Sequence, residues 1–168
     1  PFQRLIPPAP GFLEMLREIT LKYEIPLIFD EIVTGFRFSY GGAQDYYGVT
    51  PDLCTLGKII GGGFPVAAVC GHKEIMKHFD KALVGEENFL PQIGTLSGNP
   101  LASVAGLATL NILKPKSSYQ KAFDTGRQLM EGLQAALQDN GHTAQITGEP
   151  VLFDVFFSNR KIKNYRDV

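Results

Sequence analysis

Hydrophobic positions follow two patterns along the chain, helical periodicity and short apolar runs. Helical spacing of apolar residues predicts helices over 10–24, 73–79, 99–113 and 119–141. Short apolar runs predict buried strands over 26–29, 53–56, 66–70 and 151–157. Strands that alternate with helices in this way indicate an α/β fold whose sheet is mostly parallel.

One stretch interrupts the alternation of strands and helices. Residues 114–118 read KPKSS, which continues neither pattern. We therefore expect a domain boundary there, which divides the chain into residues 1–113 and residues 114–168. The chain starts with Pro1 instead of methionine and ends as though a new element were beginning, so we expect a piece of a longer protein.

Composition narrows the class of protein. Apolar residues make up 44% of the chain and the net charge is −1, which is typical of a soluble globular domain without a strong attraction to nucleic acid or to an anionic membrane. No apolar run is long enough to span a bilayer, and no signal peptide opens the chain. Cys54, Cys70 and the three histidines lack metal-ligand spacing. We expect a cytoplasmic protein with reduced cysteines, no metal site and no nucleic-acid or membrane partner.

Asp30 is the first candidate for chemistry, because it directly follows the apolar run over 26–29. In open α/β sheets, ligands bind outside the carboxyl ends of the strands. A carboxylate in that place can neutralise a cationic ligand atom, bind a metal or cap a helix. Neighbouring backbone amides can equally satisfy it in a purely structural role, and the residue alone does not separate these alternatives.

Lys58 is the second candidate, placed between Gly57 and Ile59 and followed by the glycines at 61–63. A phosphate-binding loop of nucleotide hydrolases requires Ser or Thr after the lysine, so Ile59 argues against a nucleotide-binding module. A lysine amine can also attack a carbonyl group once it is neutral, and apolar surroundings favour the neutral form. The glycines would then let backbone pass close to a bulky group. An exposed lysine beside a flexible turn is the alternative.

A third candidate segment precedes the helix expected over 99–113. Asn99 followed by Pro100 is a strong helix-start signal, because the Asn side chain can accept a first-turn amide and proline fits the first turn. Thr95 and Ser97 lie just upstream, where hydroxyls and free amides suit an anion. Capping of the helix alone explains the same residues.

Three stretches taken together resemble one known family. They read LIFDEIVTGFR over 27–37, GGAQDYYGVTPDLCTLGKIIGGGFPVAAVCG over 41–71, and GTLSGNPLA over 94–102. These are similar to the class III aminotransferases, the pyridoxal-phosphate enzymes of fold type I, and most similar to the glutamate-1-semialdehyde aminomutase subfamily. The likeness runs from Pro7 to Val168. It implies the later part of a three-layer α/β/α large domain with a mostly parallel sheet over 1–113, followed by the beginning of a small α+β C-terminal domain over 114–168.

The resemblance implies a role for five residues. Lys58 matches the lysine that forms a Schiff base with pyridoxal 5'-phosphate and moves a proton, and Asp30 matches the aspartate beside the pyridine nitrogen. Ile32 matches the aliphatic residue on the face of the ring. Thr95 matches the threonine that reaches the cofactor phosphate from the neighbouring subunit, which implies a homodimer with shared active sites. Gln44 lies near the site in the family and has a supporting role.

The implied reaction is transamination of small amino and keto substrates, between an amino acid or amine and a keto acid or aldehyde. An aminomutase would instead return the amino group to the neighbouring carbon of the same substrate. The segment over 78–95 differs from the aminomutase pattern, which favours a transaminase. The family's main phosphate-binding and ring-stacking residues have no counterpart in the chain. We therefore expect the chain alone to be inactive, and a non-catalytic fragment is the third interpretation.

Overall fold

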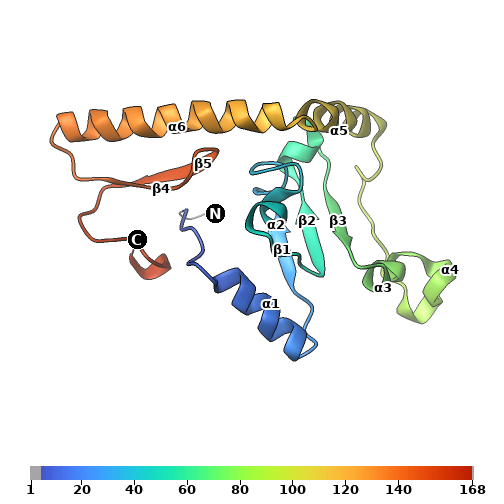
Figure 1. The fold of residues 1–168 in the computed structure, drawn as a ribbon. Helices are drawn as coiled ribbons and strands as arrows, with labels where there is room; N and C mark the ends of the chain where they lie inside the picture. The colour runs from blue at the N-terminus through green and yellow to red at the C-terminus, as the bar shows by residue number, and fades with distance from the viewer. Residues whose placement is uncertain (1–4, 168) are drawn as a thin grey trace. The chain divides into compact units, whose positions relative to one another are not determined.

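The computed structural model describes residues 5–167, which divide into two units (Figure 1). The first unit comprises Leu13–Lys114, and the second combines the residues up to Phe12 with the residues from Pro115 onward. The elements associated with the first unit are α1 (Phe12–Lys22), β1 (Ile28–Glu31), α2 (Gly42–Tyr47), β2 (Leu53–Leu56), η1 (Lys58–Gly61), β3 (Ala68–Gly71), α3 (Lys73–Met76), η2 (Lys77–Phe79), α4 (Lys81–Val84), η3 (Glu86–Asn88) and α5 (Pro100–Leu113). Those of the second are α6 (Lys116–Asp139), β4 (Gln145–Glu149), β5 (Leu152–Phe156) and η4 (Tyr165–Asp167).

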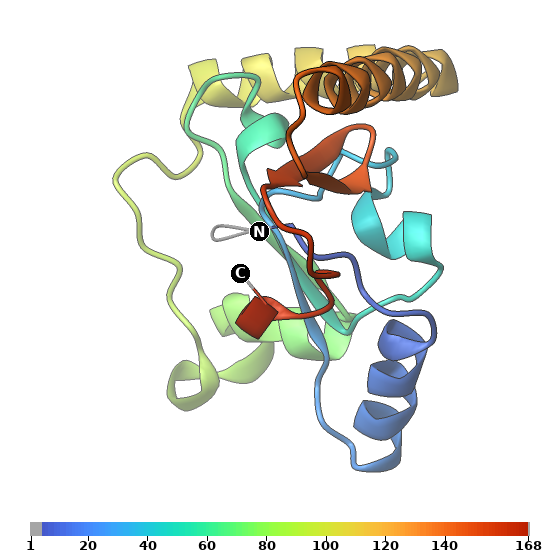
Figure 2. The ribbon, with the colours of Figure 1, turned by 90° about the vertical axis from the view of Figure 1, so that its left-hand side faces the viewer.

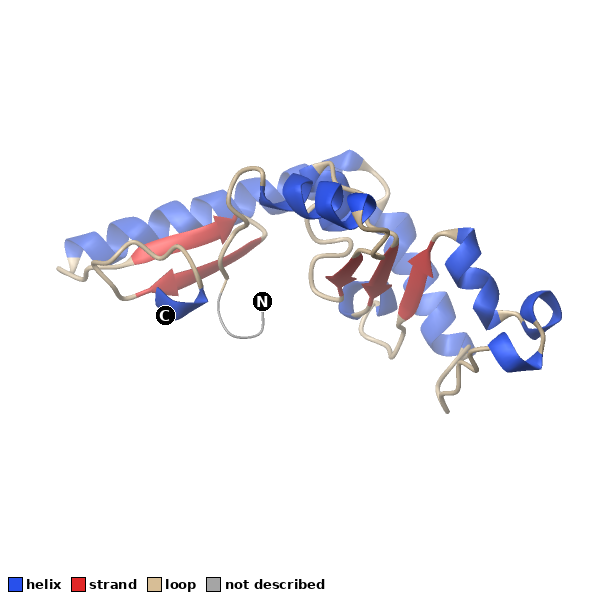
Figure 3. Cartoon of the chain, turned by 90° about the horizontal axis from the view of Figure 1, so that it is seen from below, coloured by secondary structure: helices blue, strands red, loops and turns tan. Residues whose placement is uncertain are grey.

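The sheet of the first unit has the order β1-β2-β3 (Figure 3). β1 and β2 are parallel, with Asp30 opposite Thr55, as the predicted α/β fold requires. β3 runs antiparallel to β2, so the strands described here are a mixed sheet rather than a wholly parallel one. Antiparallel edge strands are common on otherwise parallel sheets. β3 starts two residues later than the predicted strand over 66–70, after a tight turn in which the backbone N–H of Val66 donates to the carbonyl of Phe64.

β1 lies two residues later than the predicted strand over 26–29. Its start is set by its partner, because the side chain of Asp52 accepts the Leu27 N–H at 2.7 Å and the Leu27 carbonyl accepts the Asp52 N–H at 2.8 Å. The shift places Asp30 and Glu31 within the strand instead of after it. Alternating residues of a strand point to opposite faces. Asp30 is accordingly exposed, whereas Glu31 is buried.

The helices follow the local signals in the sequence more closely. The predicted start of α5 is confirmed, since Pro100 is its first residue and Asn99 Oδ1 accepts the N–H of Ala102 at 3.1 Å. α1 and α6 match the helices expected over 10–24 and 119–141. The helix expected over 73–79 is present as α3 followed by the 3-10 helix η2. The short helices α2 and α4 were not predicted, because four to six residues give too little periodicity.

The second unit places α6 beside the hairpin of β4 and β5 (Figure 3). Gly126 of α6 faces the backbone carbonyl of Pro150 so closely that no Cβ fits between them. The residues before α1 also belong to this unit, and Thr147 Oγ1 donates to the Leu5 carbonyl at 2.6 Å. That contact joins residues 142 positions apart, so no local sequence pattern predicts it. Across residues 5–167, the structure contains no helix with the length and apolar character needed to cross a membrane.

Candidate active site

The parallel pairing of β1 and β2 brings Asp30 and Lys58 to the same edge of the sheet. Asp30 is the third residue of β1, and Lys58 begins η1 two residues after the end of β2. The carboxyl ends of parallel strands share one edge, which is where ligands bind in open α/β sheets. The two candidates that the sequence singled out separately are therefore placed together by topology.

The Asp30 carboxylate is held by one of its two oxygens. Oδ1 accepts the hydroxyl of Thr55 at 3.3 Å and the backbone N–H of Ile32 at 3.1 Å. Within residues 5–167, no protein donor is hydrogen-bonded to Oδ2. An exposed carboxylate that is oriented through one oxygen can accept from a protonated nitrogen of a ligand with the other.

Lys58 has an unusual backbone conformation. Its φ is 50°, in the left-handed region that non-glycine residues rarely adopt, and the preceding Gly57 is extended, with φ −165°. Such a conformation costs roughly 1–3 kcal/mol and is concentrated at active sites. The Lys58 side chain is exposed in this chain, so the apolar surroundings expected from the sequence are not formed by these residues alone.

Two glycines, Gly62 after η1 and Gly106 of α5, allow η1 to pack closely on α5 (Figures 1 and 2). A Cβ on Gly106 of α5 would lie 2.7 Å from the Ile60 carbonyl oxygen. Gly62 ends η1 with φ 57° and abuts Thr109 so closely that no Cβ fits there. At Gly62, the close approach expected from the sequence is therefore made to a helix. This contact fixes the short helix on which Lys58 lies.

Ile32 lies against the backbone next to Lys58. A Cβ on Gly57 would be 3.2 Å from Cγ2 of Ile32. Ile32 and Thr55 also line a cavity of about 570 Å³ that extends along β3 to Ser97. Cavities of about 300–1,000 Å³ suit small molecules and cofactors. The structure thus brings Ile32, Asp30 and the backbone of Lys58 to one region.

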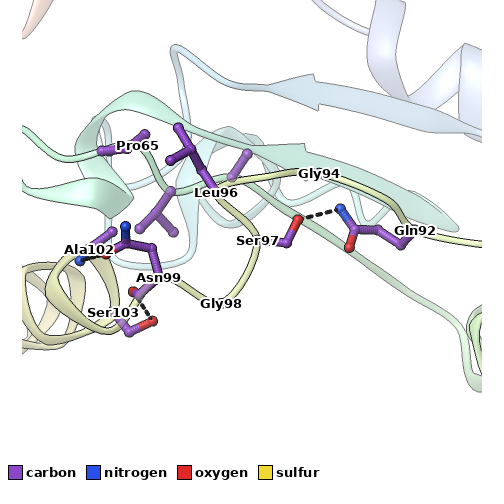
Figure 4. Close-up of a pocket in the computed structure, with 11 residues that line it drawn as sticks. Pro65, Gln92, Gly94, Leu96, Ser97, Gly98, Asn99, Ala102 and Ser103 are labelled. Carbon is purple, nitrogen blue, oxygen red and sulfur yellow. Dashed lines mark hydrogen bonds between the residues drawn. The ribbon is translucent and has the colours of Figure 1, made fainter.

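A second cavity, of about 470 Å³, lies between the segment 65–67 and the loop before α5 (Figure 4). Its polar groups include Ser97, whose Oγ accepts from Nε2 of Gln92 at 3.1 Å. Thr95 lies in the same loop, but it is exposed and lines neither this cavity nor the one at Ile32. The structure of a single chain therefore does not assign Thr95 to the site.

Gln44 makes its contacts inside the unit. Both its backbone N–H and its side-chain Nε2 donate to Oε1 of Glu31, at 3.1 and 3.0 Å. Gln44 lines neither of the two cavities described above. Gln44 therefore holds Glu31, the residue next to Asp30, and the supporting role that the resemblance implies for Gln44 stays a prediction.

Glu31 itself was missed in the sequence. It is 1% exposed and is the most buried large side chain among the described residues. An acidic pair at the end of an apolar strand carried the signal, because adjacent strand residues face opposite sides and only one of the two acids can face solvent.

No group of His, Cys, Asp and Glu side chains suited to a metal ion occurs in residues 5–167.

Comparison with known proteins gives a consistent result. The family described as aminotransferase class-III matches residues 5–167. The glutamate-1-semialdehyde 2,1-aminomutase of Pelotomaculum thermopropionicum is 46% identical over 161 residues, which are 96% of this chain and 36% of that protein. An omega-transaminase from Sphaerobacter thermophilus has 43% identity and a TM-score of 0.89 over 98% of this chain and 36% of its own. A glutamate-1-semialdehyde-aminomutase from Pseudomonas aeruginosa in complex with PMP has 30% identity and a TM-score of 0.76 over 95% and 36%. The chain spans about a third of the length of these relatives.

Proposed function

The chain belongs to the class III aminotransferases, and from this membership we propose that it carries the central residues of a pyridoxal-phosphate-dependent transaminase. The observation that supports this most directly is the shared sheet edge of Asp30 and Lys58. Lys58 lies there in a strained left-handed conformation, and Asp30 has one oxygen without a protein donor in the described residues. The active enzyme also requires residues that have no counterpart in this chain, which spans 36% of its curated relative.

The residues present fit pyridoxal 5'-phosphate. Asp30 would hold a proton on the ring nitrogen through its second oxygen, and Ile32 would lie on the face of the ring. Lys58 would bind the cofactor covalently through its amine and then carry the proton of the substrate Cα. When bound, the cofactor withdraws electrons from that carbon, so that its proton can be removed.

We propose that the reaction moves an amino group from an amino acid or amine to a keto acid or aldehyde. An intramolecular transfer, as in an aminomutase, is the second candidate, and the 46% identity to a glutamate-1-semialdehyde 2,1-aminomutase favours it. The 43% identity to an omega-transaminase favours the first. The two reactions are separated by incubating one amino substrate with and without a second keto acceptor, because only transamination requires the acceptor.

We also propose that the enzyme is a homodimer in which Thr95 reaches the cofactor phosphate of the partner subunit. Two observations are in keeping with this. Thr95 is exposed and lines neither of the two cavities described above, and four apolar side chains of α5 are also exposed, namely Leu101, Val104, Leu107 and Ile112.

We further propose that the enzyme acts in the cytoplasm, where cysteines stay reduced, because Cys54 and Cys70 are both free thiols.

The test of this function uses the longest natural form of the protein. It is incubated with pyridoxal phosphate and reduced with borohydride, and the labelled peptide is identified by mass spectrometry, with Lys58→Ala as the control. We expect one adduct at Lys58 that is absent from the variant. A full-length protein without this adduct would refute the proposal. An adduct formed by the full-length protein, but not by residues 1–168 alone, would show that this chain is a non-catalytic fragment by itself.

A further inference from the structure

We propose that Glu31 is a positioning residue for the cofactor site. Its buried carboxylate fixes the segment between β1 and α2, and thereby the places of Asp30 and Ile32 on either side of it. This inference rests on the proposed function. It concerns a residue that lines neither of the two cavities described above and that acts through its neighbours.

The Glu31 carboxylate is surrounded by hydrogen-bond donors from one segment. Oε2 accepts the backbone N–H of Ala43 at 2.6 Å and the hydroxyl of Thr34 at 3.0 Å. Oε1 accepts the backbone N–H and the side-chain Nε2 of Gln44. Within residues 5–167, Glu31 forms no ion pair, so these four donors replace the water that the carboxylate gives up on burial.

A buried carboxylate orients the groups around it, which a buried apolar side chain does not do. Burial of a charge without a counter-ion is costly unless hydrogen bonds satisfy it, and an apolar side chain of similar size would leave the backbone N–H groups of Ala43 and Gln44 without their acceptor. The carboxylate differs from an apolar side chain because its hydrogen bonds have defined directions. Four donors that converge on two oxygens hold the start of α2 and Thr34 in a single arrangement.

The backbone around Glu31 is adapted to this contact. Gly42 has φ 76°, and the carboxylate lies so close to it that no Cβ fits. The Glu31 carbonyl accepts the N–H of Gly35 at 2.8 Å, so the chain turns back on Glu31 directly after the strand. Both ends of the segment 32–44 are thus fastened to one residue.

Glu31 is connected to the site through its two neighbours in the chain, whose side chains point to the opposite face of the strand. Asp30 and Ile32 are the immediate neighbours of Glu31, so a rotation of the backbone at Glu31 moves both of them. The Ile32 N–H donates to Asp30 Oδ1, which makes the orientation of that carboxylate depend on the backbone after Glu31. A loss of the Glu31 contacts should therefore weaken cofactor binding without removing any group that touches the cofactor.

The test compares Glu31→Gln and Glu31→Asp with the parent, in the longest natural form of the protein. Gln has the size of Glu but presents an NH₂ group to donors, which breaks the pattern of acceptors. Asp keeps the charge but is shorter. The dissociation constant of pyridoxal phosphate is measured by titration at a temperature well below unfolding, together with the absorption spectrum of the bound cofactor and the unfolding midpoint of the cofactor-free protein.

We expect Glu31→Gln to raise the dissociation constant about tenfold, the effect of unsatisfied buried donors, and to shift the absorption spectrum. Glu31→Asp should lie between Gln and the parent. The control is Phe156→Leu, which lowers stability by altering a buried side chain of the second unit. The inference would be overturned if Glu31→Gln bound pyridoxal phosphate with a dissociation constant within twofold of the parent. It would also be overturned if Glu31→Gln lost no more affinity for the cofactor than Phe156→Leu does at the same unfolding midpoint.

Two further outcomes are distinguishable. If the parent binds no cofactor, the proposed function fails, irrespective of Glu31. If Glu31→Gln does not fold, Glu31→Asp carries the test alone, and a dissociation constant equal to that of the parent overturns the positioning role.

Discussion

The hydroxyl of Thr55 on β2 donates to Oδ1 of Asp30 on β1, over 3.3 Å between partners that are directly opposite in the parallel ladder. Together with the Ile32 N–H, this bond orients the carboxylate that we assign to the cofactor's ring nitrogen. The relationship depends on strand register, because a shift of one residue would turn Thr55 to the other face.

Replacement of Thr55 by Val tests this relationship. Val has nearly the same shape and removes only the donor, so the Asp30 carboxylate loses one of its two protein hydrogen bonds. We expect the dissociation constant of pyridoxal phosphate to rise about fivefold, which corresponds to a hydrogen bond of about 1 kcal/mol. Thr55→Ser keeps the hydroxyl and should bind like the parent. Equal affinity of the Val and Ser variants would show that the bond does not orient Asp30 for binding.

The conformation of Lys58 leads to a prediction about stability. In ordinary helices and strands, a protein with Gly at a given position is less stable than one with Ala by roughly 0.5–1 kcal/mol. At φ 50° the order should reverse, because Gly adopts the left-handed region without strain. We expect cofactor-free Lys58→Gly to be about 1 kcal/mol more stable than Lys58→Ala in urea unfolding, while neither variant forms the borohydride adduct. A more stable Ala variant would contradict the strain at this position.

The sequence predicted those parts of the fold that depend on neighbouring residues. The start of α5 follows from Asn99 and Pro100, and β2 follows from a short, mostly apolar run between Asp52 and Gly57. The bounds of β1 do not follow from its own residues, because the contact of Leu27 with Asp52 sets them across 25 positions. The antiparallel direction of β3 is likewise a property of strand pairing.

The same distinction applies to the site. Asp30 and Lys58 were each ambiguous alone and became a site only through their combination with the third stretch over 94–102. Glu31 and Gln44 could not be paired in advance, since their contact depends on how the segment between them folds back. The left-handed backbone of Lys58 has no residue-level signal, because lysine has no preference for it. The role of Thr95 stays a prediction.

The packing of η1 on α5 predicts an unusual effect of alanine at Gly106. In most helix interiors Gly→Ala stabilises by up to about 1 kcal/mol. Here the new Cβ would lie 2.7 Å from the Ile60 carbonyl oxygen, so either α5 or η1 must move. We expect Gly106→Ala to lower the free energy of unfolding and, because η1 begins at Lys58, to lower the yield of the Lys58 adduct.

The matched control for this variant is Gly132→Ala in α6, where a Cβ has open space. It should raise stability by up to about 1 kcal/mol and leave the adduct unchanged. Denaturant unfolding and quantitative peptide mapping of the two variants measure both effects. A Gly106→Ala variant that behaves like Gly132→Ala would mean that η1 and α5 are not in close contact.

The two free cysteines should differ in reactivity, although they are opposite each other in the ladder of β2 and β3. The pKa of the Cys54 thiol is raised above 9.0, primarily because the thiol is buried. Cys70 is exposed. Alkylation proceeds through the thiolate, so we expect iodoacetamide to label Cys70 first and Cys54 only when the sheet opens. Mass spectrometry of a time course measures the order, and Cys70→Ser should leave only the slow phase.

Asp52 predicts how stability depends on pH. Its carboxylate accepts the Leu27 N–H and pairs with Arg17 at 3.0 Å, and its pKa is lowered from 3.8, first by the Leu27 bond and further by Arg17 and His72. Because the folded pKa lies below the unfolded one, the ionised group stabilises the fold above about pH 4, and this stabilisation is lost as the pH falls through the lowered pKa. Asp52→Asn should therefore cost about 1 kcal/mol near neutral pH and nothing in strong acid. Urea unfolding across this range measures the difference, and a cost independent of pH would show that the charge of Asp52 contributes no stability.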